Sequence, residues 1–317
     1  MLFKNANIFV GGQFQHGSFR VENGKFAEIL TTVPAEDGID LENQYVIPGL
    51  VDVHNHGNSG ADFSDGDYDG LVKMARYLAQ NGVTSFAPAS MTLPYDVLEA
   101  AYKTAVQFKK AQPEGCARLM GIQMEGPFFS EKKKGAQNGA WLHAPDVAMF
   151  RRLMAASQGL VKLVSIAPEE PGAMEFIEAV EGEVTVSIAH TTADYGTSME
   201  AFRLGARQVT HLFNAMPAFS HRAPGVVGAA LDTPLCNVEL ICDGVHIHPS
   251  VVRAVFKMFG SKRVILISDT MRAAGMPDGD YTLGGQAVQV KGNRATLSDG
   301  TLAGSVTDLM KCMKTAV

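Results

Sequence analysis

From about residue 47 onward, the sequence repeats one pattern eight times: a short apolar run followed by a segment whose apolar residues have helical spacing. This alternation is typical of βα units, whose strands pair in parallel. Eight such units predict an α/β fold of the (β/α)8 TIM-barrel type for residues 47–317. The predicted strands are residues 46–54, 83–87, 118–125, 161–167, 184–190, 209–211, 238–243 and 264–269.

The segments between these runs have the spacing of amphipathic helices. Residues 281–304 differ, because they contain several glycine-rich turn sequences and predict a β-hairpin insertion. The insertion follows the eighth strand, so we expect it on the barrel face where the strands end. The predicted helices are residues 67–81, 95–111, 145–157, 172–181, 195–205, 225–231, 249–260 and 305–316.

Residues 1–46 have a different pattern, in which short alternating runs are separated by Gly11-Gly12 and Asn23-Gly24. Such dipeptides form the tight turns of antiparallel hairpins. We therefore expect a small β-sandwich-like domain to begin here.

Composition narrows the class of partner. The net charge of -6 disfavours nucleic acid or an anionic membrane as the main partner, although a local basic pocket for a small anion is compatible with it. Four cysteines without a CxxC pair indicate a reducing compartment. The polar residues near Met1 do not resemble a signal peptide. We expect a cytoplasmic protein.

Reactive side chains recur at the ends of the predicted strands. In a (β/α)8 barrel, the carboxyl ends of the strands form the active site. These positions hold His54, His56, Glu125, His190, His211, Asp243 and Asp269. A random scatter of polar residues would rarely give this arrangement.

His54 and His56 are two residues apart, so on a strand both imidazoles point to one side. Imidazole and carboxylate groups bind zinc, iron and related ions. Glu125 could therefore bridge two ions, one held by the HxH pair and the other by His190 and His211. The alternatives are hydrogen-bonded loop histidines for the HxH pair and a structural salt bridge for Glu125.

Asp269 follows the eighth run, and position alone does not assign its role. Beside a metal it could be a ligand or a general base that later protonates a leaving amine. Otherwise it could cap a following helix.

Five segments together resemble the N-acetylglucosamine-6-phosphate deacetylases of the amidohydrolase superfamily, and the resemblance spans the whole chain. The most specific are the EGPF-type and THLFNAM motifs. The segments are residues 48–57 (PGLVDVHNHG), 124–128 (MEGPF), 210–217 (THLFNAMP), 243–246 (DGVH) and 268–271 (SDTM).

The resemblance implies metal-dependent hydrolysis of N-acetylglucosamine 6-phosphate to glucosamine 6-phosphate and acetate, in amino-sugar catabolism or cell-wall recycling. It implies that Glu125, His190 and His211 bind the main divalent metal. His54 and His56 would bind a second one, and Asp269 would be the catalytic base and acid. Zinc or iron is favoured, and cobalt or manganese is also compatible with these ligands.

The resemblance also implies contacts with a sugar phosphate. Arg222 would bind the phosphate of the substrate in the neighbouring copy, across the interface of a homodimer. The fork-shaped guanidinium group suits the oxygens of a phosphate. Alternatively, Arg222 is a surface cation and His246 a polar loop residue. Lys132–Lys134 predict a solvated loop, which could add positive potential for an anionic substrate. The implied substrate-binding residues are Ala136, Asn214, Ala215, Arg222, His246, Leu302, Ala303 and Gly304.

Chains of this family continue beyond the last barrel helix, with segments that complete the small domain. This sequence ends at Val317, so we expect the C-terminal part of that domain to be missing and strand edges to be unpaired.

Two other functions are compatible with the pattern. Many cyclic-amide hydrolases and deaminases use a carboxylated lysine at the end of the fourth strand, whereas Lys162 lies at its start. A non-catalytic sugar-phosphate sensor would not need the full metal set together with Asp269.

Overall fold

The computed structural model describes all 317 residues, which form two compact units, Met1–Gly49 and Leu50–Val317.

The first unit is a five-stranded sheet with the strand order β3-β2-β1-β4. Strands β1 (Leu2–Val10), β2 (Gln13–Glu22) and β3 (Lys25–Leu30) are antiparallel, and their turns use positive φ angles at Gly11, Gly12, Asn23 and Gly24. Strands β4 (Ile39–Asp40) and β5 (Tyr45–Val46) pair with β1 in parallel. The expected sandwich is not formed within this unit, because all five strands belong to one sheet.

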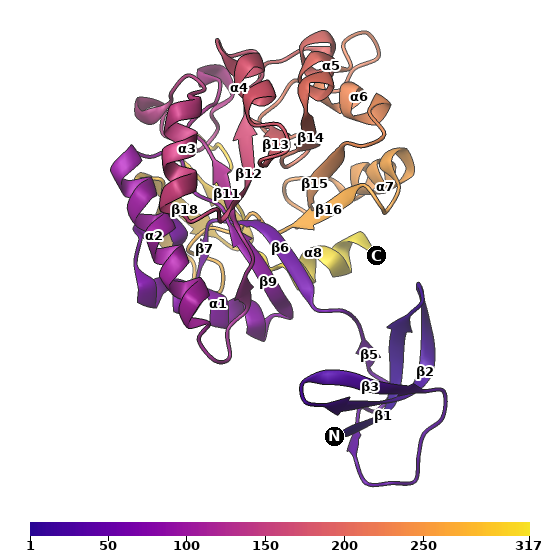
Figure 1. The fold of residues 1–317 in the computed structure, drawn as a ribbon. Coiled ribbons are helices and arrows are strands. Elements are labelled where there is room, and N and C mark those ends of the chain that lie inside the picture. The colour runs from indigo at the N-terminus through magenta and orange to yellow at the C-terminus, as the bar shows by residue number, and fades with distance from the viewer. The chain divides into compact units, whose positions relative to one another are not determined.

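The second unit is built on parallel strands that form two sheets, β10-β9-β6 and β11-β12-β13-β14-β15-β16 (Figure 1). Strands β10 and β11 are two pieces of the third predicted strand. Each of the eight predicted runs therefore contains strand. The bounds are β6 Leu50–Asn55, β9 Val83–Pro88, β10 Arg118–Leu119, β11 Ile122–Glu125, β12 Val161–Ile166, β13 Thr185–Ile188, β14 Ala206–Val209, β15 Asn237–Ile241 and β16 Val264–Ile267.

Backbone contacts join the two sheets on both sides. A parallel bridge pairs Ala89 with Gln123. On the other side, the backbone N–H of Asp269 donates to the carbonyl of His54 at 2.9 Å, and that of His56 donates to the carbonyl of Thr270 at 2.8 Å. The parallel strands thus form a curled sheet, as a TIM-type barrel requires.

Eight α-helices accompany these strands. Helices α1, α3, α5 and α8 each begin after an aspartate whose side chain accepts a hydrogen bond from the first turn. The last helix begins at Leu309 and not near residue 305, because Ser305 instead hydrogen-bonds Ser268 and Asp308 is the cap. The bounds are α1 Tyr68–Gln80, α2 Tyr95–Ala111, α3 Val147–Ala156, α4 Ala173–Ala179, α5 Tyr195–Leu204, α6 Gly225–Asp232, α7 Pro249–Phe259 and α8 Leu309–Ala316.

Short elements complete the unit. Strands β17 (Gly279–Leu283), β18 (Gln286–Lys291) and β19 (Arg294–Thr296) form an antiparallel sheet and lie between β16 and α8 in the sequence. None of the helices combines the length and apolar character that crossing a bilayer requires. The remaining elements are β7 Gly57–Asn58, β8 Ala61–Asp62 and the 3-10 turns η1 Phe63–Asp65, η2 Glu131–Lys133 and η3 Gly139–Trp141.

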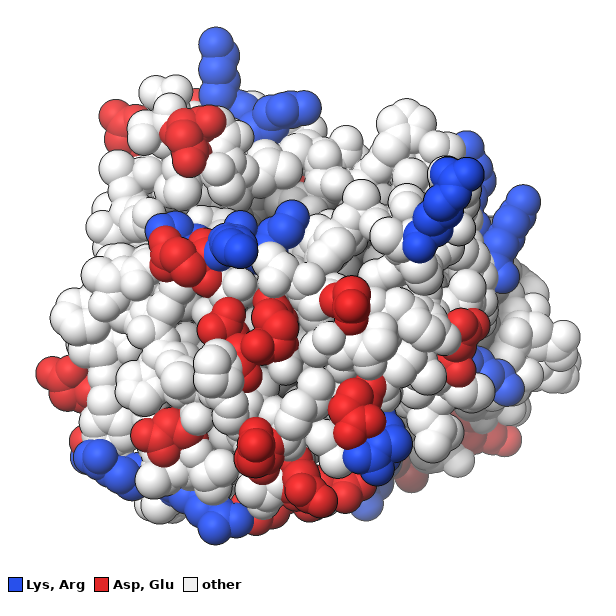
Figure 2. Space-filling model, turned by 90° about the horizontal axis from the view of Figure 1, so that it is seen from above, with Lys and Arg blue, Asp and Glu red and all other residues white.

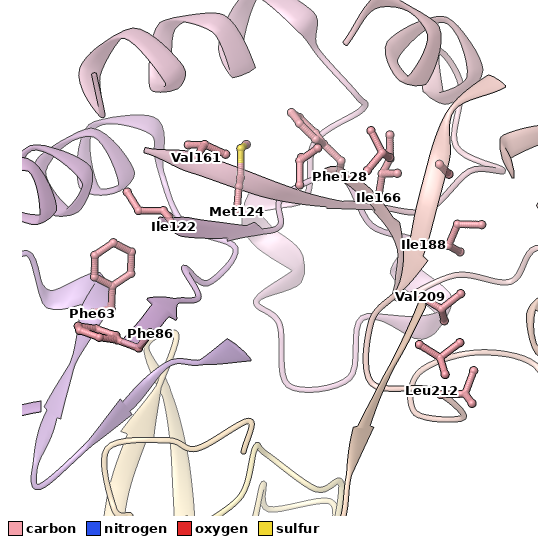
Figure 3. Close-up of a cluster of buried hydrophobic side chains, with 14 of the residues drawn as sticks. Phe63, Phe86, Ile122, Met124, Phe128, Val161, Ile166, Ile188, Val209 and Leu212 are labelled. Atoms are coloured by element: carbon pink, nitrogen blue, oxygen red, sulfur yellow. The ribbon is translucent and has the colours of Figure 1, made fainter. Parts of the chain in front are cut away.

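The core of the second unit lies between strands and helices. Figure 3 shows part of it, with labelled side chains from β9, β11, β12, β13 and β14, among them Phe86, Ile122 and Ile188. All three are completely buried. Because burial of apolar surface is the main driving force of folding, this core fixes the strand ends at which the polar residues lie.

Several strands end earlier than the sequence predicts. His190, His211 and Asp269 each lie two residues beyond β13, β14 and β16, and have φ angles of 44°, 30° and 48°. A positive φ is incompatible with a β-strand and is costly for residues other than glycine. Such strain persists only where the surrounding structure imposes it, and it is common in active sites.

Candidate metal centre

Four imidazoles and one carboxylate converge where the parallel strands end. His54 lies near the end of β6, and His56 directly follows it. Glu125 is the last residue of β11, and His190 and His211 follow β13 and β14. All five side chains are buried. The ends of these strands come together in the fold, which brings together residues that are far apart in the sequence.

Glu125 is shared by two groups of potential ligands. Its Oε1 lies 3.4 Å from Nε2 of His54, and its Oε2 lies 3.2 Å from Nε2 of His56. Oε1 also lies 3.2 Å from Nε2 of His211 and 3.4 Å from Nε2 of His190. Each group of three offers ligand atoms that are all within 4.8 Å of one another.

Hydrogen bonds fix the orientation of two imidazoles. Nδ1 of His56 lies 3.1 Å from the carbonyl of Ala89, and Nδ1 of His190 lies 2.9 Å from the carbonyl of Lys133. A carbonyl oxygen can only accept, so both Nδ1 atoms carry the proton. In a neutral ring, Nε2 is then the atom with a free lone pair, and in both residues it faces Glu125.

The donor atoms fit a divalent metal. Neutral imidazole nitrogens and a carboxylate are ligands for zinc, iron, cobalt and manganese. Two buried ring nitrogens, Nε2 of His54 and Nδ1 of His211, have no hydrogen-bond partner. A buried polar atom without a partner is costly, and a cation would satisfy Nε2 of His54 beside Glu125.

The electrostatics show how strongly the cluster favours positive charge. Burial lowers the pKa of both HxH imidazoles, but Glu125 and Asp269 outweigh it and raise the pKa of His56 to about 10 and that of His54 well above its usual value. Conversely, burial raises the pKa of Glu125, but the histidines hold that pKa well below its usual range. Such reciprocal shifts are typical of functional sites.

Asp269 faces the same cluster. Its Oδ1 lies 3.4 Å from Nε2 of His56 and 3.6 Å from Nε2 of His54. Burial raises its pKa, yet His54 and His56 outweigh burial and lower the pKa to about 2. The residues after Asp269 form an isolated bridge and a turn, so it is not the cap of a helix.

A cavity of about 490 Å³ opens onto this cluster, a size typical of small-molecule sites. Six of the sequence-predicted substrate contacts line it: Ala136, Asn214, Ala215, His246, Leu302 and Gly304. Asp243 accepts a hydrogen bond from Nδ1 of His246 at 2.7 Å, which orients this imidazole. His246 is therefore an oriented cavity residue and not a free loop side chain.

The other two predicted contacts are not among the lining residues. Ala303 is completely buried behind its neighbours. Arg222 is exposed, and its Nη1 lies 2.7 Å from Nε2 of His221.

Several residues at the site were not predicted from the sequence. Gln137 donates from Nε2 to Oε2 of Glu125 at 3.0 Å, and Glu239 of β15 contacts His54. Lys132, Lys133 and Lys134, expected as a solvated loop that could add positive potential, line the cavity. The buried charge at Glu239, inside an apolar strand, was a usable signal, whereas Gln137 gave none.

Basic side chains at the cavity are a local feature. Over the face shown in Figure 2, acidic and basic side chains are interspersed. At the cavity, Lys132, Lys133 and Lys134 lie beside Glu131, which pairs with Lys134 at 2.6 Å, so the positive charge there is limited to a few side chains.

Comparison with known proteins identifies the family. The amidohydrolase family model matches residues 45–317. An N-acetylglucosamine-6-phosphate deacetylase from Bacillus subtilis is 39% identical over 314 residues, which cover 96% of this chain and 79% of the relative. An N-acetylgalactosamine-6-phosphate deacetylase from Escherichia coli is 36% identical over 267 residues, covering 84% of this chain and 70% of that one.

A solved structure agrees with this assignment. It is an aspartate-to-alanine mutant of N-acetyl-D-glucosamine-6-phosphate deacetylase from Mycobacterium smegmatis in complex with N-acetyl-D-glucosamine-6-phosphate. The TM-score is 0.94 at 29% identity, over 100% of this chain and 83% of that chain. By its sequence, its curled parallel sheet and its strand-end cluster, the chain belongs to the amidohydrolase family, in the group of N-acetylglucosamine-6-phosphate deacetylases.

Proposed function

We propose that the chain removes the N-acetyl group of N-acetylglucosamine 6-phosphate by hydrolysis, giving glucosamine 6-phosphate and acetate in amino-sugar catabolism or cell-wall recycling. One observation carries the proposal: Glu125, shared by two histidine pairs, lies with Asp269 in a cavity of small-molecule size. The similarity to deacetylases of phosphorylated amino sugars supplies the substrate class.

We propose two sites for a divalent metal, one formed by His54, His56 and Glu125 and the other by Glu125, His190 and His211. When bound, such a metal polarises an amide carbonyl and lowers the pKa of water toward neutrality. Zinc or iron suits these ligands, and cobalt or manganese is compatible with them.

In this mechanism, Asp269 moves the proton. Its carboxylate is ionised at neutral pH, because the neighbouring histidines outweigh burial and lower its pKa to about 2. Oδ1 takes that proton from the attacking water, whose oxygen forms a bond to the acetyl carbon. The same carboxyl group then returns the proton to the amine nitrogen as the C–N bond breaks, which leaves acetate and the free amino sugar.

The remaining residues would bind the sugar and its phosphate. We propose that Ala136, Asn214, Ala215 and His246 contact the substrate together with the segment Leu302–Gly304. The lysines of the cavity add positive potential for a phosphate dianion. Binding of this kind holds the acetyl group against the metal ligands, which is a large part of the catalytic effect.

We also propose a homodimer in which Arg222 reaches the active site of the neighbouring copy. This accounts for an arginine that is exposed and does not line the cavity of its own chain.

Arg222→Ala should lower kcat/KM for N-acetylglucosamine 6-phosphate by about 10- to 100-fold, because a charge-assisted contact with phosphate is lost. Turnover of N-acetylglucosamine should change by less than about threefold, since it has no phosphate to lose. Equal losses for both substrates would remove Arg222 from phosphate binding. Arg222→Ala and Asp269→Asn chains, each strongly impaired alone, should recover about a quarter of wild-type activity when they are unfolded and refolded together in equal amounts, if each dimer site uses both chains.

The substrate is tested by acetate release from three sugars. The purified chain should act on N-acetylglucosamine 6-phosphate in preference to its 4-epimer, N-acetylgalactosamine 6-phosphate, and to unphosphorylated N-acetylglucosamine. The epimer is the relevant competitor, because a relative of similar identity carries that name. Preference for the epimer would replace the proposed sugar, and no acetate from any of the three would reject the proposed function.

We propose that residues 1–46 belong to a small β domain and that residues 47–317 form the (β/α)8 hydrolase barrel, with a β-hairpin insertion at 281–304. We also propose a cytoplasmic location, because a phosphorylated sugar is charged and does not cross a membrane unaided.

A further inference from the structure

Glu239 is a buried acidic residue that the proposed mechanism does not use. It lies in the middle of β15 between the apolar residues Val238 and Leu240, and its side chain has no exposed surface. A carboxyl group in such a position is costly unless several hydrogen bonds satisfy it. Its partners therefore indicate why it is there.

Two of the three polar contacts of Glu239 are with residues of the metal centre, and the third is with Gln208. Oε2 lies 2.9 Å from Nδ1 of His54. The same Oε2 lies 3.3 Å from the backbone nitrogen of His211, and Oε1 lies 2.6 Å from Nε2 of Gln208. One side chain thus contacts a residue from each of the two groups that Glu125 links.

These contacts determine the tautomer of His54. The backbone N–H of His211 can only donate, so Oε2 of Glu239 is an acceptor. As a carboxylate, Glu239 also accepts from Nδ1 of His54, which leaves Nε2 with the lone pair. Gln123 also has its amide nitrogen 3.0 Å from Nδ1, and turning that amide over would place its oxygen there instead. Both groups are then acceptors for the same Nδ1 proton.

The geometry points to Glu239 as the positioning residue that presents Nε2 of His54 as a metal ligand. Nε2 of His54 has no hydrogen-bond partner of its own and lies 3.4 Å from Glu125, on the side of the ring opposite to Glu239. Carboxylates that accept the second N–H of a ligating histidine fix its orientation and make it a stronger ligand. The inference rests on the proposed metal sites. It means that His54, which lies in β6, is held in position by a residue of β15.

Three variants separate this role from a general structural one. Glu239→Leu removes the acceptor. Glu239→Gln keeps a carbonyl oxygen that can still accept from Nδ1 of His54. Gln208→Leu is the matched control, because it removes the other side-chain hydrogen bond of Glu239 and keeps both partners of the contact with His54. Thermal unfolding shows which variants are folded, and Zn²⁺ affinities are measured by competition with a chromophoric chelator.

We expect Glu239→Leu to lower the affinity for one of two Zn²⁺ ions by about 10- to 100-fold and to leave the affinity for the other ion unchanged. Glu239→Gln should recover most of this loss, and Gln208→Leu should match the wild type. Unchanged affinities in Glu239→Leu, equal weakening of both ions, or the same loss in Gln208→Leu would each overturn the inference. The readout contains no substrate, so failure here is distinct from failure to release acetate.

A measurement on the unmodified chain does not depend on whether the variants fold. Nitrogen-15 NMR of histidine side chains distinguishes a protonated ring nitrogen from one with a free or metal-bound lone pair. In the zinc-loaded chain, His54 should show a proton on Nδ1 and none on Nε2. A proton on Nε2 would overturn the inference.

Discussion

Asp269→Asn should lower kcat for acetate release by about 100- to 10,000-fold, the usual contribution of a general acid and base. The amide keeps the size of the side chain but cannot take a proton from water or return one to the amine. Metal content, measured by inductively coupled plasma mass spectrometry, should stay at the wild-type value, since Glu125 and the four histidines remain. Near-normal kcat would remove Asp269 from the chemical step.

Asp243→Asn is the matched control for this variant. Asp243 also lies two residues beyond its strand, β15, but it contacts His246 and not the HxH pair. Its amide would loosen His246 in the proposed sugar-binding part of the cavity. We expect a higher KM with kcat within about tenfold of the wild type, since uniform binding is lost and proton transfer is not. The same kcat loss in both variants would show that the effect of Asp269→Asn is not specific.

Glu125→Ala should remove metal from both proposed sites at once, because this one carboxylate belongs to both groups. It also leaves four buried imidazoles without their shared anion, a change that costs about 3–5 kcal/mol when a buried ion pair is broken. We expect less than about one tenth of an ion per chain and acetate release at background, because neither site keeps its bridging ligand.

His190→Asn tests whether a change in one group removes metal from that group alone. His190 belongs to only one group, so the variant should retain the ion held by His54, His56 and Glu125. Metal content near one ion per chain for His190→Asn, with almost none for Glu125→Ala, is the expected pattern. Full metal content in Glu125→Ala would contradict the shared site.

Much of the site could be predicted from the sequence, because the position of a residue at the end of a parallel strand determines where it lies in the barrel. The carboxyl ends of parallel strands meet, so a polar residue at the end of each apolar run is expected to converge with the others. His54, Glu125 and His211 come together in this way although they are far apart along the chain. The helices followed from spacing, and most of their bounds were predicted to within a few residues.

The differences have physical causes. The predicted strands extended through His190, His211 and Asp269, because nothing in an apolar run marks the residue at which φ becomes positive. Gln137 was missed because its approach to Glu125 depends on the path of a long loop. Glu239 was hidden among the strand residues, although a charge inside an apolar run can be noticed.

The sandwich-like N-terminal domain was expected from alternating runs and turns. These features identify hairpins but not how many layers they form, and the first unit is a single sheet. Several of its large apolar side chains are exposed, among them Phe14, Phe26 and Tyr45. Alternation alone therefore predicted strands well and their packing poorly.

We conclude that this chain is a metal-dependent deacetylase of N-acetylglucosamine 6-phosphate. The most direct test is acetate release from this sugar by protein that has been stripped with a chelator, dialysed and then given Zn²⁺, Fe²⁺, Co²⁺ or Mn²⁺ separately. The stripped protein should release no acetate, and at least one of these ions should restore the release. Release that continues undiminished in the stripped protein would contradict this conclusion.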